Sequence, residues 1–78
     1  IEIVDVHYYS GHKLAIKFND GKENIIDFGN FIFKNNHPSI DKYRKIEEFL
    51  NYKIVDGNLN WNDYDMIFSL EDLYDCNI

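Results

Sequence analysis

The stretch LAIKFNDGKENIIDF, residues 14–28, decides the fold of this 78-residue chain. Large apolar residues recur at every second position in two runs: Leu14, Ile16 and Phe18 alternate with Ala15 and Lys17, then Ile26 and Phe28 alternate with Ile25 and Asp27. A period of two places these side chains on one face of a strand. Asn19-Asp20-Gly21 between the runs is typical of a tight turn, because glycine takes the positive φ angles that hairpin turns need. The stretch therefore predicts a β-hairpin with one apolar face.

A third strand is expected ahead of this hairpin. Val4, Val6 and Tyr8 alternate with Asp5 and His7. The Ser10-Gly11 pair then supplies a turn before the second strand. We therefore predict an antiparallel meander with one core face and one hydrated face.

The periodicity changes after Pro38. The apolar residues now recur at three- and four-residue steps, at Ile40, Tyr43, Ile46, Phe49 and Leu50. Charged residues fill the positions between them, which indicates an amphipathic helix. Ser39 or Asp41 is its predicted N-cap.

The last third predicts a second hairpin and a short helix. Residues 52–55 and 58–62 flank Asp56-Gly57, a turn signal. Ser69-Leu70-Glu71-Asp72 approximates a capping box and begins a helix that ends near Cys76. The expected fold is one α+β domain, residues 1–78, of order βββαββα and two layers. Its predicted core comprises Val4, Val6, Leu14, Ile16, Phe18, Phe28, Ile46, Phe49 and Trp61.

The composition indicates the cellular environment in which the chain is expected. A single cysteine, Cys76, cannot form an internal disulfide, which favours a reducing, cytoplasmic environment. Residues 1–9 carry no basic group of the kind that opens a signal peptide, and no apolar run approaches the length of a membrane span. We therefore expect a cytoplasmic protein without a membrane partner.

Charge is distributed unevenly. All eight basic residues lie in residues 1–53, where eight acids balance them, so the net charge of −6 belongs to residues 54–78. A negative surface repels phosphate backbones and anionic lipid, so binding to duplex DNA at physiological salt is not expected. It steers a basic partner instead. The alternative is a hydrated surface that keeps a small protein soluble, and the sequence leaves both open.

No residue group predicts catalysis, a cofactor or a metal. The histidines His7, His12 and His37 lack the paired spacing of zinc sites and are expected on the surface beside turns. The acids Asp63 and Asp65 lack the glycine and the closing glutamate of a calcium loop. Cys76 follows an acid rather than a cation, so we expect an unreactive thiol.

Trp61 has two interpretations. It alternates with Leu59 on one strand face, which favours a core position. An aromatic anchor beside an acidic connection is the arrangement that interfaces favour, and is the alternative.

The chain also resembles the small bacterial family known as domain of unknown function 2442. The similarity is carried by Val4-x-Val6, Leu14-x-Ile16-x-Phe18-x-Asp20-Gly21, Asp27-Phe28, Phe49, Tyr52-x-Ile54, Trp61, Asp63-Tyr64-Asp65 and Leu70-Glu71-x-Leu73-Tyr74. It runs nearly end to end. Many relatives have proline where this chain has Asn62 and Glu71.

This resemblance implies an α+β fold, a bacterial or phage origin and no known catalytic activity. It further implies a gene beside that of a second small protein, in an arrangement like a toxin–antitoxin pair. The leading hypothesis is accordingly a non-catalytic interaction module, the acidic antitoxin-like or regulatory partner of a small basic protein.

The partner is expected to dock on the acids and tyrosines of the last third: Asp63, Tyr64, Asp65, Glu71, Asp72, Tyr74 and Asp75. Tyr64 and Tyr74 are the predicted anchors, unless they only cap the core edge. One alternative is a metal-dependent or hydrolytic enzyme that uses these carboxylates with His7 or His12. Another is a phage-type inhibitor that mimics nucleic acid, and self-association is left open.

Overall fold

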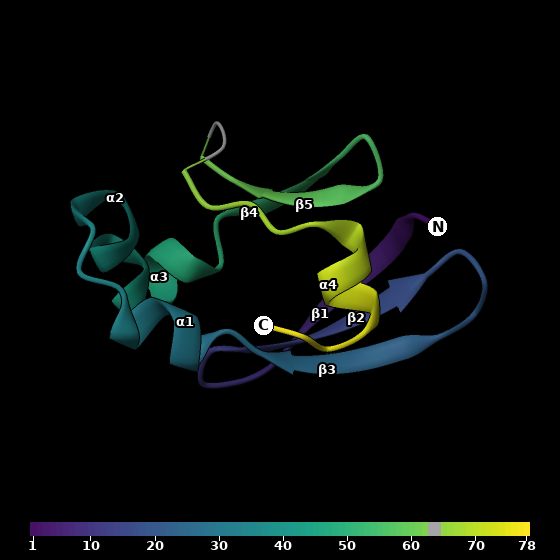
Figure 1. Cartoon of the computed structure of the whole chain (residues 1–78), viewed down its shortest axis with the longest axis horizontal. Coiled ribbons are helices and arrows are strands. Elements are labelled where there is room, and N and C mark those ends of the chain that lie inside the picture. Colours follow the sequence, from purple (N-terminus) through teal and green to yellow (C-terminus); the bar gives the residue numbers. More distant parts are fainter. Residues whose placement is uncertain (63–64) are drawn as a thin grey trace.

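The computed structural model describes residues 1–62 and 65–78 of the chain (Figure 1). The strands β1 (Ile3–Ser10), β2 (Lys13–Phe18) and β3 (Glu23–Asp27) form one antiparallel sheet, and β4 (Tyr52–Val55) and β5 (Asn58–Trp61) form a second. Four short helical turns, α1 (Gly29–Lys34), α2 (Pro38–Asp41), η1 (Lys42–Arg44) and α3 (Ile46–Phe49), lie between the sheets in sequence, and α4 (Leu70–Tyr74) follows β5. The predicted α+β class and the order of its strands are confirmed.

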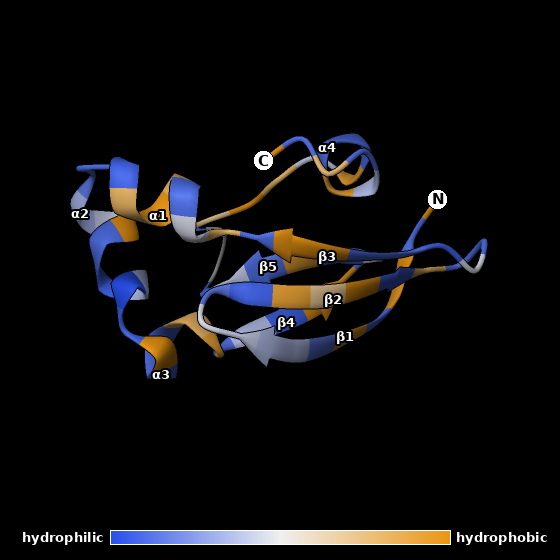
Figure 2. Cartoon of the chain, turned by 90° about the horizontal axis from the view of Figure 1, so that it is seen from below, coloured by the Kyte–Doolittle hydropathy of each residue, from blue (hydrophilic) through white to orange (hydrophobic). Residues whose placement is uncertain are grey.

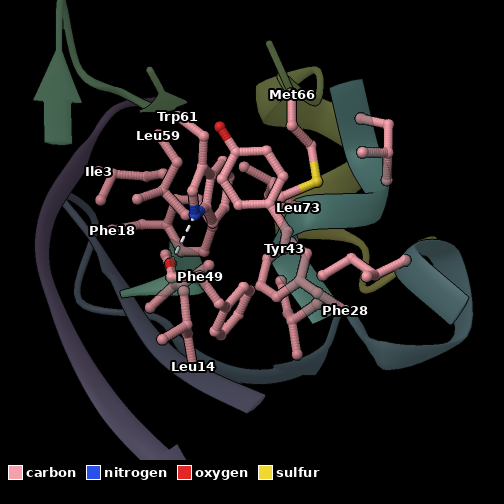
Figure 3. Packing of buried hydrophobic residues seen from close by; sticks show 14 residues of the cluster. Ile3, Leu14, Phe18, Phe28, Tyr43, Phe49, Leu59, Trp61, Met66 and Leu73 are labelled. Atoms are coloured by element: carbon pink, nitrogen blue, oxygen red, sulfur yellow. Dashed lines mark hydrogen bonds between the residues drawn. The ribbon is translucent and has the colours of Figure 1, made fainter. Parts of the chain in front are cut away.

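The layers enclose one hydrophobic core. The β4–β5 hairpin lies over one face of the three-stranded sheet, with α4 beside it and α1 to α3 gathered at one end (Figures 1 and 2). The buried cluster comprises Ile3, Leu14, Ile16, Phe18, Ile26, Phe28, Ile32, Ile40, Tyr43, Phe49, Leu59, Trp61, Met66 and Leu73 (Figure 3). No helix in the described residues is long and apolar enough to cross a membrane.

The alternation in β2 and β3 is confirmed. Leu14, Ile16 and Phe18 are buried and their sequence neighbours face away from the core. In β1 the prediction for Val4 is wrong, since its side chain is 54% exposed and Ile3 is buried instead. The cause is a register shift between Ile3 and Asp5, because a bulge residue moves the alternation by one position.

Further along β1, Val6 regains the core side and packs against the cluster as a partly buried residue. Tyr8 shares the predicted face but remains 46% exposed. The strand therefore contributes less to the core than its sequence pattern predicts.

The predicted continuous helix after Pro38 is instead three short turns. Lys45, between η1 and α3, has an extended backbone with φ −81° and ψ 130°. In a continuous α-helix, residues three apart differ by about 60° in direction around the axis. Apolar side chains at a strict three-residue spacing would therefore rotate away from the core face. Breaking the helix keeps Tyr43 and Phe49 buried, while Ile46 is half-buried.

The N-cap also differs from the prediction. The imidazole of His37, rather than Ser39 or Asp41, caps α2, because its Nδ1 accepts a hydrogen bond from the Ser39 N–H at 3.1 Å. The turn α1 was not predicted. It begins after Asp27, whose carboxylate accepts from the Gly29 N–H at 2.8 Å.

The second hairpin is confirmed and places Trp61 in the core. Asp56 and Gly57 take positive φ angles of 52° and 77°, as a two-residue hairpin turn requires. Trp61 is fully buried and its Nε1–H donates to the Phe49 carbonyl at 2.7 Å (Figure 3). The core interpretation of Trp61 is therefore confirmed.

Candidate functional site

The helix α4 carries most of the described residues that the sequence singles out, and its first turn forms as predicted. Ser69 is the N-cap, and its hydroxyl accepts from the Asp72 N–H at 3.1 Å. Leu73 is buried in the core, so one side of the helix is fixed. Glu71 and Asp75 are exposed, and Asp72 is half-buried.

The other end of α4 is held by β3. The side-chain amide of Asn24 donates to the carbonyls of Leu73 at 3.1 Å and Tyr74 at 2.7 Å. The Lys22 ammonium donates to the same Tyr74 carbonyl at 2.9 Å. These donors satisfy carbonyls that a helix leaves without intrahelical partners at its C-terminal end. Asn24 was missed by the sequence analysis, although an asparagine in register with Ile26 and Phe28 on the core face was the available signal.

Tyr74 closes this attachment and is only partly exposed. Its ring packs edge-on against Phe18 with centroids 5.0 Å apart, and the Lys22 ammonium lies 4.0 Å from its centroid. Its hydroxyl donates to the Asp20 carboxylate. This bond lowers the pKa of Asp20, with help from the Lys22 N–H, and raises the pKa of Tyr74. Tyr74 therefore fastens α4 to the β2–β3 turn.

Because its pKa is lowered in the folded state, the Asp20 carboxylate stabilises the fold above its ordinary pKa of 3.8. That contribution is lost as pH falls through the folded pKa. We therefore expect Asp20→Asn to lower stability at neutral pH and to flatten the decline below about pH 4. Urea unfolding over a pH series measures both effects.

The matched control for this prediction is Glu23→Gln. Glu23 is exposed and has no side-chain hydrogen bond within the described residues. If the free energy of unfolding of Asp20→Asn falls below about pH 4 as steeply as that of Glu23→Gln, the role given to Asp20 is contradicted.

Asp65 lies in a different environment from the acids of α4. It forms an ion pair with Lys42 at 2.6 Å and accepts hydrogen bonds from Asn62 at 3.1 Å and the Tyr43 hydroxyl at 3.3 Å. The Lys42 ammonium, followed by the Asn62 amide, lowers the pKa of Asp65, which in turn raises the pKa of Lys42. The charge of Asp65 is thus compensated from outside residues 54–78.

The acids of α4 have no such partner. Within residues 1–62 and 65–78, no ion pair involves Glu71, Asp72 or Asp75. The predicted site residues Asp63 and Tyr64 lie outside the described residues. On the exposed side of α4, the charges of Glu71, Asp72 and the C-cap residue Asp75 are therefore not neutralised by an ion pair within the described residues, and the same holds for Glu47 and Glu48 of α3.

The histidines do not converge. His12 is half-buried, contrary to the surface prediction, with its Nε2 2.8 Å from the Tyr43 carbonyl and its ring against Phe33 and Phe49. His7 is exposed and pairs with Asp5 at 2.8 Å. Among the described residues, no three His, Cys, Asp or Glu side chains are grouped so as to hold a metal ion.

A cleft of about 610 Å³ lies between α3 and the outer side of the β4–β5 hairpin. Its lining residues are Tyr43, Glu48, Leu50, Asn51, Tyr52, Lys53, Val55, Asn60 and Asn62. This described lining contains neither histidine nor cysteine, the usual general base and thiol nucleophile. Of the residues predicted for a site, none of those that the structure describes lines it.

Comparison with known proteins agrees with the resemblance noted in the sequence. Neither the curated proteins nor the solved structures contain a significant match to the chain. A family model does match, over residues 3–77, nearly the whole chain. The chain therefore belongs to the family described as "Protein of unknown function (DUF2442)".

Proposed function

We propose that this protein is a non-catalytic interaction module that binds a small basic protein through the exposed side of α4. The observation that supports this most is that unpaired acidic residues lie on a helix that is held in place. Glu71, Asp72 and the C-cap residue Asp75 make no ion pair within the described residues, and α4 is capped at its first turn by Ser69 and attached to β3 at its C-terminal end by Asn24. The proposed role is antitoxin-like or regulatory, in a cytoplasmic setting.

The physics of such a site is electrostatic steering. A negative surface attracts a basic partner over about one Debye length, ~8 Å at physiological ionic strength, and so raises the association rate. Rigid presentation adds to this, because a fixed helix loses little conformational entropy when it binds. Tyr74 contributes the exposed part of its ring, while Tyr64 stays a predicted anchor. Asp65 contributes less, because Lys42 compensates its charge.

The test is charge reversal on α4. We expect Asp72→Lys or Asp75→Lys to lower the association rate by a factor between about 2 and 10 and to flatten its salt dependence. The partner is first identified by cross-linking in cells, and the expected candidate is a small basic protein encoded beside this gene. Stopped-flow association over a salt series gives both quantities.

A matched control is Glu47→Lys, which makes the same change of net charge on α3, away from α4 (Figure 1). We expect it to leave the salt dependence close to that of the wild type. If the α4 variants keep a native circular dichroism spectrum and associate as fast as Glu47→Lys, then α4 is not the binding surface.

A further inference from the structure

The strand β1 forms the edge of the three-stranded sheet. The strand order is β1-β2-β3, and α4 lies beside β3 at the other edge (Figure 2). An edge strand presents backbone N–H and C=O groups that can pair with another strand. Part of this edge is already used, since the Ile3 N–H donates to the Gly57 carbonyl at 2.8 Å.

The register identifies which backbone groups of β1 point outward. The Phe18 N–H donates to the Lys22 carbonyl, so Phe18 and Ile16 direct their backbone groups toward β3. By alternation, Lys17 and Ala15 face β1, where they pair with Asp5 and His7. The N–H and C=O groups of Val6 and Tyr8 therefore point away from the sheet.

The side chains along this edge are unusual for a free strand. Val4 and Tyr8 are 54% and 46% exposed, although they are apolar. Between them, the Asp5 carboxylate accepts from the outward Val6 N–H at 2.9 Å and pairs with the His7 imidazole at 2.8 Å. The edge thus combines two exposed apolar groups with one acid and one base, and the acid and the base lie symmetrically on either side of Val6.

We propose that a second copy of this chain pairs with β1 in antiparallel orientation, about a twofold axis at Val6. This register sets Asp5 opposite His7 of the second copy, on the face of the sheet that points away from the core. In the dimer the Val6 N–H donates its hydrogen bond to the Val6 carbonyl of the second copy instead of to the Asp5 carboxylate. A continuous sheet of two copies results, with an acid and a base opposite each other on both sides of the axis.

Neighbouring registers lack this complementarity. An axis at Asp5 sets two carboxylates opposite each other, and an axis at His7 sets two imidazoles opposite each other. Two carboxylates directly opposite are unfavourable because like charges repel, and two imidazoles lack the acid–base pairing. The charge order of this strand therefore fits a second copy in one register.

The seam is short. Register shifts at Ile3/Asp5 and Tyr8/Ser10 bound the regular part of β1, and bulges limit further pairing. The dimer is accordingly expected at the weak end of protein association. Because α4 lies at the far edge of each sheet, this pairing leaves both α4 surfaces open and is independent of the function proposed above (Figure 2).

Sedimentation of the pure protein over a concentration series tests the pairing. The wild type should pass from monomer to dimer with rising concentration. Tyr8→Lys should stay monomeric, because it places a charge in the seam, whereas Ile25→Lys should dimerise like the wild type. Ile25 is a matched control, being 51% exposed on β3. A wild type that remains monomeric, or two lysine variants that dimerise equally, would overturn the proposal.

Cross-linking tests the register. In a Cys76→Ser background, Asp5→Cys and His7→Cys are made separately and oxidised alone or mixed. The proposed axis sets these positions opposite each other as a close, non-hydrogen-bonded pair, so the mixture should form a disulfide-linked dimer faster than either variant alone. Equal rates for the mixture and the single variants would refute the register. No other protein is needed, so the outcome does not depend on what α4 binds.

Discussion

Replacing Trp61 by alanine is expected to lower the free energy of unfolding by about 3–5 kcal/mol. The side chain is fully buried, and its ring packs against those of Phe28, Phe49 and Phe68 with centroids 5.5–6.1 Å apart. A domain of this kind has about 5–15 kcal/mol of stability, so the loss removes a large part of it. Urea unfolding followed by far-ultraviolet circular dichroism measures the change without a tryptophan signal.

Two further variants separate the causes of this loss. Trp61→Phe keeps an aromatic ring but leaves the Phe49 carbonyl without its donor, and should cost about 1–3 kcal/mol. Tyr9→Ala removes an exposed ring from β1 and should change stability by less than about 0.5 kcal/mol. A Trp61→Ala protein as stable as the Tyr9→Ala protein would show that the core does not depend on this ring.

The fold was predictable where a local pattern and a local turn agree. In the stretch from Leu14 to Phe28 the large apolar residues recur at every second position on both sides of a glycine turn, and every core residue predicted there is buried. The failure at Val4 has a specific cause, since one bulge residue reverses the alternation and the sequence carries no marker for it.

The helical region shows a limit of periodicity. Residues 40, 43, 46 and 49 recur at a constant step of three, a spacing that fits short turns better than a long α-helix. The apolar residues were identified correctly in part, with Ile40, Tyr43 and Phe49 buried. The length of the helix was overestimated. The chain breaks into short turns because each turn is oriented so that its apolar residue reaches the core.

At the candidate site, the local interactions were predictable and the distant ones were not. The Ser69 cap lies three residues from its donor and was identified from its spacing. The Lys42–Asp65 ion pair and the bonds from Asn24 to α4 join segments that only the tertiary fold brings together. Counting charges by sequence segment therefore overestimated the unpaired charge at Asp65. It could not identify Asn24 as the residue that holds α4.

Replacing Asn24 by leucine is expected to release the C-terminal end of α4. Leucine has the same number and branching of side-chain heavy atoms as asparagine, although it is bulkier, and it has no donor, so the carbonyls of Leu73 and Tyr74 lose the amide that binds them. The Tyr74 carbonyl keeps the hydrogen bond from the Lys22 ammonium, and the Leu73 carbonyl keeps a 3.4 Å bond from the Cys76 N–H. Losing the two bonds from the amide should therefore cost about 1–3 kcal/mol. Because Leu73 still packs in the core, we expect local opening of α4 before global unfolding.

Hydrogen exchange distinguishes these two kinds of unfolding. In Asn24→Leu the amides of Leu73 and Asp75, which donate within α4 to Ser69 and Glu71, should exchange faster than in the wild type. The exchange rates of the β2 amides should change only as much as the change in global stability requires. Asn36→Leu is the control, because Asn36 is exposed and its side chain forms no hydrogen bond within the described residues. If α4 in Asn24→Leu exchanges no faster than in Asn36→Leu, the buried amide does not hold the helix, and the rigid presentation of Glu71, Asp72 and Asp75 needs another cause.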